Sequence, residues 1–184
     1  MPDLRDLPDG SRVFVDTNIF DLAYRAASAS CADLIERIAR GEITAYVNIQ
    51  VLSDLLHKLM LAEAQQKKII ANRSASKLKE KLSKDRMIAA KLSDYQRYFE
   101  QTLALGLKVM SINEQLLIET KLERATYGLM TGDSLHLGCM NRCKNSRRKA
   151  PLCDIVTYDG DFDHIVGVTV WRPQDVAKLQ PVGA

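Results

Sequence analysis

The sequence has no long hydrophobic run, and this absence limits the class of protein. No stretch of about 18 apolar residues is free of charged side chains, so we predict no membrane-spanning helix. The N-terminal segment MPDLRDLPDGSR also lacks the apolar core of a signal peptide. These two absences indicate a cytoplasmic protein. With 184 residues, 46% of them hydrophobic, the chain is expected to form one domain, residues 1–184, around a buried core.

Cysteine is scarce, and its spacing excludes the common zinc and redox patterns. The four cysteines contain neither a CxxC motif nor paired zinc-binding spacing. Cys139 and Cys143 lie one helical turn apart on an apolar face, so we expect buried free thiols. The sequence also has no Ser/His/Asp or Cys/His pairing in a plausible nucleophile setting and no glycine-rich phosphate loop. Any catalysis must therefore come from other residue types.

Short β-branched runs alternate with helical patterns, which predicts an α/β fold. Strands are expected at 12–15, 44–47, 107–112, 153–157 and 168–171. Helical spacing of apolar residues predicts helices over 19–38, from 48 onward, over 113–126 and over 131–143. Residues 60–105 follow a helical pattern that contains no glycine and no proline. A break at 71–74 would divide this long excursion into two helices. We predict a three-layer α/β/α domain whose central, mostly parallel sheet has four to five strands.

Four aspartates stand where such a fold would gather them. Asp16 and Asp159 follow predicted strands, Asp133 opens a predicted helix, and Asp54 lies within one. Taken singly, Asp16 and Asp133 could be helix caps and Asp159 a turn residue. Asp54 is flanked by leucines, and a charge near a buried face needs a partner. Because ligands collect beyond the carboxyl ends of parallel strands, we predict one carboxylate cluster that holds a hard divalent metal for phosphodiester hydrolysis.

The positive charge is concentrated in two runs, although the net charge is only +3. Residues 67–91 carry nine cations against two acids, and residues 142–149 carry five cations and no acid. Such a run can be a solvated helix face or a nucleic-acid-binding surface, and the acidic cluster favours the second interpretation. Residues 145–151 are expected to form a polar basic loop. The candidate RNA-binding residues are Lys67, Lys68, Arg73, Lys77, Arg142, Lys144, Arg147 and Arg148.

Four segments of the chain resemble the motifs of PIN-domain nucleases. VFVDTNIF is similar to the opening strand of that family, and VLSDLL looks like its second acidic motif, usually LxEL. YGLMTGDSLHLG resembles the third motif, and DIVTYDGDFDHIVGVTVWRP resembles the closing block. The motifs occur in the family's order and cover both ends of the chain. By size and layout the subgroup most similar is the VapC-type toxin, a small ribonuclease inhibited by an antitoxin.

The resemblance implies specific roles for individual residues. Asp16, Asp54, Asp133 and Asp159 would ligate Mg²⁺ or Mn²⁺, with Asp161 as an auxiliary ligand. Thr17, Asn18 and Thr157 match polar positions that orient the acids. We expect His136, between two apolar neighbours, to be structural. The resemblance further implies an endoribonuclease that leaves 5′-phosphate and 3′-hydroxyl ends, an antitoxin partner and a homodimer.

Two other interpretations remain open from the sequence. Asp54 stands where the family usually has glutamate, which favours an inactive PIN-like module that binds RNA or a partner protein. A metal-dependent phosphatase also places an aspartate after its first strand. That class commonly has a second acid two residues later, and Asn18 occupies that position here. Metal-dependent cleavage of RNA would favour the nuclease, and turnover of a small phosphate ester would favour the phosphatase.

Overall fold

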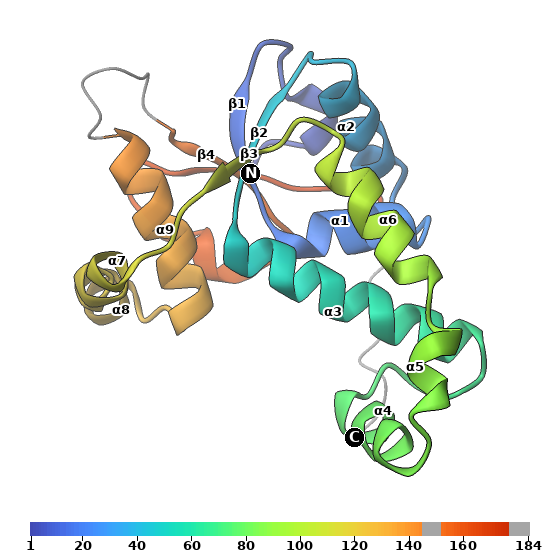
Figure 1. Cartoon of the computed structure of the whole chain (residues 1–184). Coiled ribbons are helices and arrows are strands. Elements are labelled where there is room, and N and C mark those ends of the chain that lie inside the picture. The colour runs from blue at the N-terminus through green and yellow to red at the C-terminus, as the bar shows by residue number, and fades with distance from the viewer. Residues whose placement is uncertain (145–151, 177–184) are drawn as a thin grey trace.

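The centre of the molecule is a five-stranded sheet in which every pair of neighbouring strands is parallel (Figure 1). The structure is a computed structural model that describes residues 1–144 and 152–176. In spatial order the strands are β3 (Lys108–Met110), β2 (Thr44–Asn48), β1 (Arg12–Val15), β4 (Asp154–Val156) and β5 (Thr169–Trp171). The predicted α/β fold is confirmed, and the sheet is parallel throughout.

The helices form two groups on opposite sides of the sheet (Figure 1). The first group is α1 (Thr17–Tyr24), α2 (Ala29–Ala39), α3 (Ile49–Gln66), α4 (Ala75–Lys84), α5 (Met87–Lys91) and α6 (Asp94–Leu103). The second is α7 (Glu114–Glu119), α8 (Lys121–Tyr127) and α9 (Thr131–Lys144). Connections between parallel strands are right-handed. Because the chain moves from β1 to β2 to β3 in one direction and returns past β1 to β4, the return connection lies on the other face.

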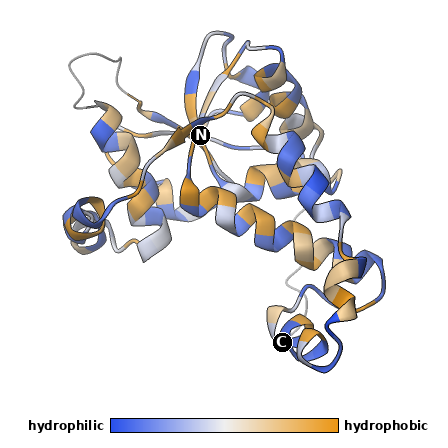
Figure 2. Cartoon of the chain, viewed as in Figure 1, coloured by the Kyte–Doolittle hydropathy of each residue, from blue (hydrophilic) through white to orange (hydrophobic). Residues whose placement is uncertain are grey.

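The central strands are covered on both faces, and their sequences reflect this. Val13, Phe14 and Val15 are all fully buried, so β1 shows no alternation between buried and exposed residues. Burying each such side chain contributes about 1.5–3 kcal/mol. The first turns of α3, beside the sheet, are also largely hydrophobic (Figure 2). In the part of the chain that the structure describes, no helix is both long and apolar enough to cross a membrane.

Two predicted helices are each divided in the structure. The region predicted as one helix over 19–38 is α1 followed by α2, because Ala26 takes a left-handed conformation with φ 51°. The Ser28 side chain then accepts a hydrogen bond from the Cys31 backbone amide and begins α2. Similarly, the helix predicted over 113–126 is α7 and α8, which meet at Thr120. Periodicity identified the helical residues but not these turns.

The excursion between β2 and β3 contains more helices than expected. After α3 it forms α4, α5 and α6 rather than one further helix. Lys68 is left-handed with φ 58°, and Asp85 and Leu92 are extended, so each interrupts the helical path. We call residues 75–91 the α4–α5 arm. It extends away from the sheet (Figure 1) and packs through a separate small hydrophobic cluster formed by Leu61, Ala64, Ile70, Leu78 and Leu92.

Candidate active site

A polar hollow of about 250 Å³ lies at the carboxyl ends of β1 and β4. This is the point where the strand order reverses around β1, the usual ligand position of a parallel α/β sheet. We call it the acidic hollow. Its lining residues are Asp16, Thr17, Asn18, Asp54, His57, Lys58, Gly132, Asp133, His136 and Asp159. All four aspartates singled out in the sequence therefore line one hollow.

Asp16 is held at the floor of the acidic hollow by three hydrogen bonds. It follows β1 and caps α1, accepting at 2.5 Å from the backbone amide of Thr17. Its other carboxylate oxygen accepts from Asn18 Nδ2 at 2.7 Å and from Thr157 Oγ1 at 2.7 Å. The side chain is only 12% exposed. Asp16 therefore has a fixed position and one side facing the hollow.

Thr157 and Asn18 join the ends of β1 and β4. The Thr157 hydroxyl donates to Asp16 and accepts from the Asp159 backbone amide at 3.0 Å. The Asn18 carboxamide donates to Thr157 Oγ1 at 3.1 Å and accepts from the Tyr158 backbone amide at 3.0 Å. These polar side chains fix the turn after β4 relative to β1. The position of Asp159 depends on them.

Asp159 and Asp161 lie on the turn after β4, with different relations to the hollow. Asp159 caps the short 3₁₀ helix Gly160–Phe162 by accepting from the Asp161 backbone amide at 3.0 Å. Its carbonyl accepts a hydrogen bond from Arg172. Asp161 is exposed and does not line the hollow. The auxiliary role of Asp161 as a metal ligand stays a prediction.

Asp133 lies in the first turn of α9 and has the most perturbed carboxylate of the hollow. Burial, followed by the charges of Asp159, Asp16 and Asp161, raises the pKa of Asp133 from 3.8 to about 6. The second effect is the repulsion expected when carboxylates share a site. Because the charges of Asp159 and Asp16 act on Asp133, at least these three aspartates of the hollow are electrostatically coupled.

Asp54 comes from α3, and two neighbours on that helix also reach the hollow. Gln50 Nε2 donates to Asp54 at 3.3 Å, one turn earlier on the helix. His57 and Lys58 follow Asp54 by three and four residues, so they share its face. Sequence analysis did not single out either residue. Their spacing from Asp54 was the signal that could have found them.

His136 forms part of the wall of the hollow, and its surroundings are those of a core residue. It is 4% exposed, and its ring packs on Phe14 with centroids 5.1 Å apart. Asn48 Nδ2 lies 3.0 Å from its Nδ1, and Asp16 lies 3.9 Å from its Nε2. Burial lowers the pKa of His136, so the ring is neutral at pH 7. A neutral ring that accepts from Asn48 has its proton on Nε2, directed to Asp16.

The carboxylate oxygens of the hollow suit a hard divalent cation, although they are too far apart to coordinate one ion together. Among residues 1–144 and 152–176, no three Asp, Glu, His or Cys side chains are grouped closely enough to hold a metal ion. The four acids nevertheless supply only carboxylate oxygens, the ligands that Mg²⁺ and Mn²⁺ prefer. A cation would also relieve the repulsion at Asp133. The chemistry fits such an ion, and direct ligation by all four requires the carboxylates to move closer.

Three of the predicted RNA-binding cations are engaged within the protein. Lys67 contacts Glu63 at 2.5 Å and Asp94 at 3.1 Å. Arg73 pairs with Asp21 at 2.7 Å, and Arg142 pairs with Glu119 at 2.8 Å. Lys68 and Lys77 are exposed. The Lys144 side chain, Arg147, Arg148 and the rest of the predicted loop at 145–151 lie outside the described residues. RNA binding by any of these residues stays a prediction.

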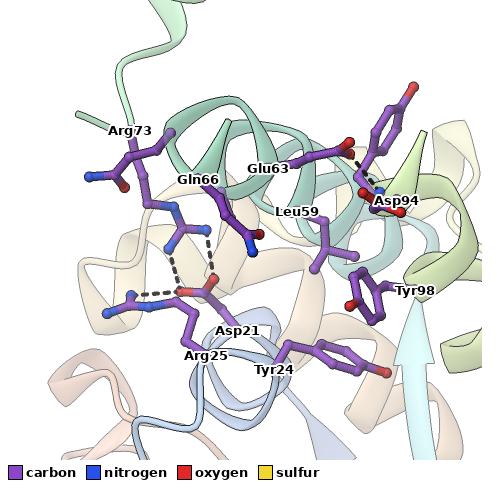
Figure 3. A pocket seen from close by; sticks show the side chains of 12 residues that line it. Asp21, Tyr24, Arg25, Leu59, Glu63, Gln66, Arg73, Asp94 and Tyr98 are labelled. Carbon is purple, nitrogen blue, oxygen red and sulfur yellow. Dashed lines mark hydrogen bonds and ion pairs between the residues drawn. The ribbon is translucent and has the colours of Figure 1, made fainter. Parts of the chain in front are cut away.

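A second, larger pocket of about 520 Å³ lies between α1, α3 and α6 (Figure 3). We call it the tyrosine pocket, after Tyr24, Tyr95 and Tyr98 in its lining. Figure 3 shows Asp21 between Arg25 and Arg73 at one side and the rings of Tyr24 and Tyr98 at the other. Sequence analysis gave no indication of this pocket, because its walls come from segments far apart in the chain.

Comparison with solved structures finds two chains of toxin–antitoxin complexes, the first of which supports the same fold. A chain of the VapBC2 complex of Rickettsia felis, solved bound to a DNA fragment from its promoter, matches with a TM-score of 0.50. The match covers 88% of this chain and 98% of that chain at 16% identity. A chain of a toxin–antitoxin complex from Klebsiella pneumoniae gives a TM-score of 0.48 at 14% identity, covering 85% and 95%. No protein-family model and no curated protein sequence matches the chain. The likeness shows a PIN-like fold.

Proposed function

We propose that the protein is a metal-dependent endoribonuclease. The observation that carries this proposal is the acidic hollow at the carboxyl edge of the parallel sheet. Its lining residues include Asp16, Asp54, Asp133 and Asp159. The raised pKa of Asp133 supports it, because unneutralised carboxylates are held together there at a cost. The PIN-like fold supports it by analogy only.

Each side chain of the hollow has a role in this proposal. Asp16, Asp54, Asp133 and Asp159 would hold Mg²⁺ or Mn²⁺, with Asp161 contributing from the rim. A bound divalent cation supplies Lewis-acid activation of water and stabilises the leaving oxygen. Thr157 and Asn18 keep the Asp16 carboxylate aimed into the hollow through their hydrogen bonds, and Thr17 anchors the start of α1 by donating to the Val51 carbonyl.

The substrate strand would be bound by cations on the α4–α5 arm and on the segment between α3 and α4. Within the described residues, Lys68, Lys77, Lys79 and Lys81 are exposed and form no ion pair. Such free ammonium groups neutralise backbone phosphates, giving affinity with little base discrimination. Lys67, Arg73 and Arg142 would need to leave their acidic partners to do the same, so we assign them the smaller share of binding.

We also propose an antitoxin protein as the partner and a homodimer as the assembly. The likeness to a chain of the VapBC2 complex of Rickettsia felis supports the antitoxin partner, whereas the homodimer rests on the resemblance of the sequence motifs alone. The direct test is co-purification of the full chain with the product of any small neighbouring reading frame, followed by measurement of the mass of the complex.

The decisive experiment measures cleavage of labelled RNA by the full chain with Mn²⁺, with Mg²⁺ and with a chelator. We expect cleavage only with metal, and we expect Asp133→Asn to lower kcat/KM by more than about 100-fold. That loss exceeds the 10- to 100-fold typical of residues that merely orient metal ligands. Asp133 is preferred to Asp16 for this test because Asp16 accepts three hydrogen bonds that join β1 to β4.

Asp33→Asn is the matched control for this experiment. Asp33 is exposed on α2, away from the acidic hollow, so the same chemical change should leave the rate unaltered. Metal-independent cleavage, or equal loss in both variants, would contradict the proposal.

A second candidate function is an inactive PIN-like module that binds RNA without cutting it. It is favoured by Asp54, which is shorter than glutamate, and by the incomplete convergence of the acids among the described residues. In the same experiment this module would shift RNA in a gel and leave it intact with every metal.

A further inference from the structure

The tyrosine pocket and the acidic hollow are separate cavities whose walls both include α1 and α3. Helix α1 begins at Asp16 in the hollow and reaches the pocket with Asp21 and Tyr24. Helix α3 passes in the same way from Asp54 in the hollow to residues 59–66 in the pocket. The two helices pack against each other. The two cavities therefore lie in sequence along the same pair of packed helices.

The inner surface of the pocket combines flat apolar rings with unused polar groups. The Tyr24 and Tyr98 rings lie 6.0 Å apart with an interplanar angle of 43°, and Tyr98 is 41% exposed. The Gln66 carboxamide lies between the rings and the charged side of the pocket (Figure 3). Among the described residues, neither that amide nor the Tyr98 hydroxyl has a hydrogen-bond partner. Both remain available to a ligand with a planar face and a polar edge.

The acids of the pocket are already neutralised, so they do not exclude a polyanion. Arg73 and Arg25 both pair with Asp21, at 2.7 and 3.2 Å. Although burial alone would raise the pKa of Asp21, the hydrogen bonds and charge of Arg73 lower it. Glu63 and Asp94 share Lys67, and Asp94 also pairs with Arg97 at 3.1 Å. The remaining surface favours no anionic or cationic ligand strongly, and recognition falls to the rings and to Gln66.

Lys58 connects the two cavities electrostatically. It lines the acidic hollow, where it is the one permanently cationic residue among the described lining residues. Its charge also contributes to the lowered pKa of Asp21, which lines the tyrosine pocket. A phosphate between the two cavities would therefore meet a lysine.

We propose that the tyrosine pocket binds an unpaired nucleobase of the substrate RNA, next to the phosphodiester that lies in the acidic hollow. The base stacks on Tyr98, Gln66 contacts its polar edge, and Lys58 contacts the intervening phosphate. Stacking on aromatic rings and contact with splayed base edges are how proteins recognise single-stranded RNA. A cavity of about 520 Å³ accommodates a ligand of this size. The inference rests on the proposed ribonuclease function and adds a subsite for one base next to the phosphodiester in the acidic hollow.

The test is a thermodynamic cycle between the protein and the oligonucleotide. Binding of a labelled single-stranded RNA hexamer is measured with the Asp133→Asn chain, which should leave the RNA intact. We expect Tyr98→Ala to raise Kd by about 5- to 100-fold, the range for loss of one stacked base. Tyr98→Phe keeps the stacking ring and should bind much more tightly than Tyr98→Ala, losing at most the contribution of the hydroxyl. One abasic position in the hexamer should weaken binding to the parent and have little further effect on Tyr98→Ala.

Leu103→Ala is the matched control, because Leu103 is 43% exposed on the same helix and does not line the pocket. Circular dichroism of each variant verifies folding. Equal Kd for Tyr98→Ala and its parent, or additive effects of that substitution and the abasic position, would overturn the inference. If Tyr98→Ala and its parent bind the hexamer with equal Kd, a peptide of a partner protein becomes the alternative ligand of the pocket.

Failure of this inference and failure of the proposed function are distinguishable. Metal-dependent cleavage with no dependence on Tyr98 would overturn only the base pocket. Tyr98-dependent binding without cleavage by the unsubstituted chain would overturn only the ribonuclease. No binding of the hexamer by any variant would overturn the base pocket.

Discussion

At Asp133 the requirements of stability and of the proposed metal binding oppose each other. Burial and three neighbouring carboxylates raise the pKa of this residue to about 6, whereas the unfolded chain has the ordinary value of 3.8. At pH 7 the group is ionised in both states, and the folded state therefore bears the cost of desolvation and repulsion. Below pH 3.8 it is protonated in both states, so the cost disappears.

Asp133→Asn should therefore stabilise the metal-free protein at pH 7 and have little effect near pH 3.5. Because Asp133 is only half-buried, solvent screening reduces the gain to on the order of 1 kcal/mol. This corresponds to a rise in Tm of about 2–4 °C for a chain of this size. The measurement is thermal unfolding in a chelating buffer across pH 3.5–8. A variant less stable than the parent at pH 7 would show that Asp133 has a structural role instead.

Glu63 illustrates a dependence between elements that are distant in sequence. Helix α6 has no side-chain cap from Ser93, the residue at its start. Instead Glu63 of α3 accepts from the backbone amides of Ser93 at 3.0 Å and Tyr95 at 2.8 Å. Lys67 holds the same carboxylate and also donates to the Lys91 carbonyl at 2.7 Å. The buried acid of α3 therefore positions α6 and the pocket wall that carries Tyr98.

Glu63→Ala should destabilise α6 locally, because two helix-terminal amides lose their acceptor. The expected cost is about 1–3 kcal/mol, the range for buried groups left without a partner. Hydrogen exchange measured by mass spectrometry should show faster exchange across residues 93–103 and little change in β1. Glu36→Ala, an exposed glutamate on α2, provides the comparison. Uniform acceleration throughout the chain would mean that α6 does not unfold separately.

The parts of the fold that could be predicted from sequence are those that local patterns determine. β1 begins and ends at the predicted residues, and Asn48 begins α3 by accepting from the Val51 amide. The turns at Ala26 and Lys68 could not be predicted, because neither residue type favours the left-handed conformation that it adopts. Tertiary packing overrides local preference there.

The candidate site was likewise predictable only in the residues that a local pattern marks. The four aspartates were recognisable by their places after strands or within helices, whereas His57 and Lys58 carry no motif of their own. The tyrosine pocket depends on how α6 returns across α3, and long-range contacts such as those of Glu63 with the start of α6 hold that return in place. No periodicity in the sequence encodes such a contact.

For the molecule as a whole, the α4–α5 arm places positive charge far from the sheet. If RNA reaches the arm, each neutralised phosphate releases counterions, so affinity must fall with salt. Lys77→Ala with Lys81→Ala should reduce the slope of log K against log salt by about 1.4, since each cation on a single strand accounts for roughly 0.7. Titrations of the RNA hexamer at several salt concentrations measure this slope.

Lys108→Ala is the control for the arm. Lys108 is an exposed lysine at the amino end of β3, at the edge of the sheet opposite the acidic hollow. An equal change of slope in this variant would indicate non-specific attraction by total charge rather than contact with the arm.

The bond between Thr157 and Asp16 joins residues that are 141 positions apart. During synthesis, β1, β2 and β3 leave the ribosome long before β4, and Asp159 follows last of the four aspartates. A nascent chain that ends before residue 154 therefore lacks one carboxylate and the hydroxyl that aims another. The arrangement delays assembly of the hollow until nearly the whole chain has been made, so under the proposed ribonuclease function an incomplete translation product would not cleave the RNA around it.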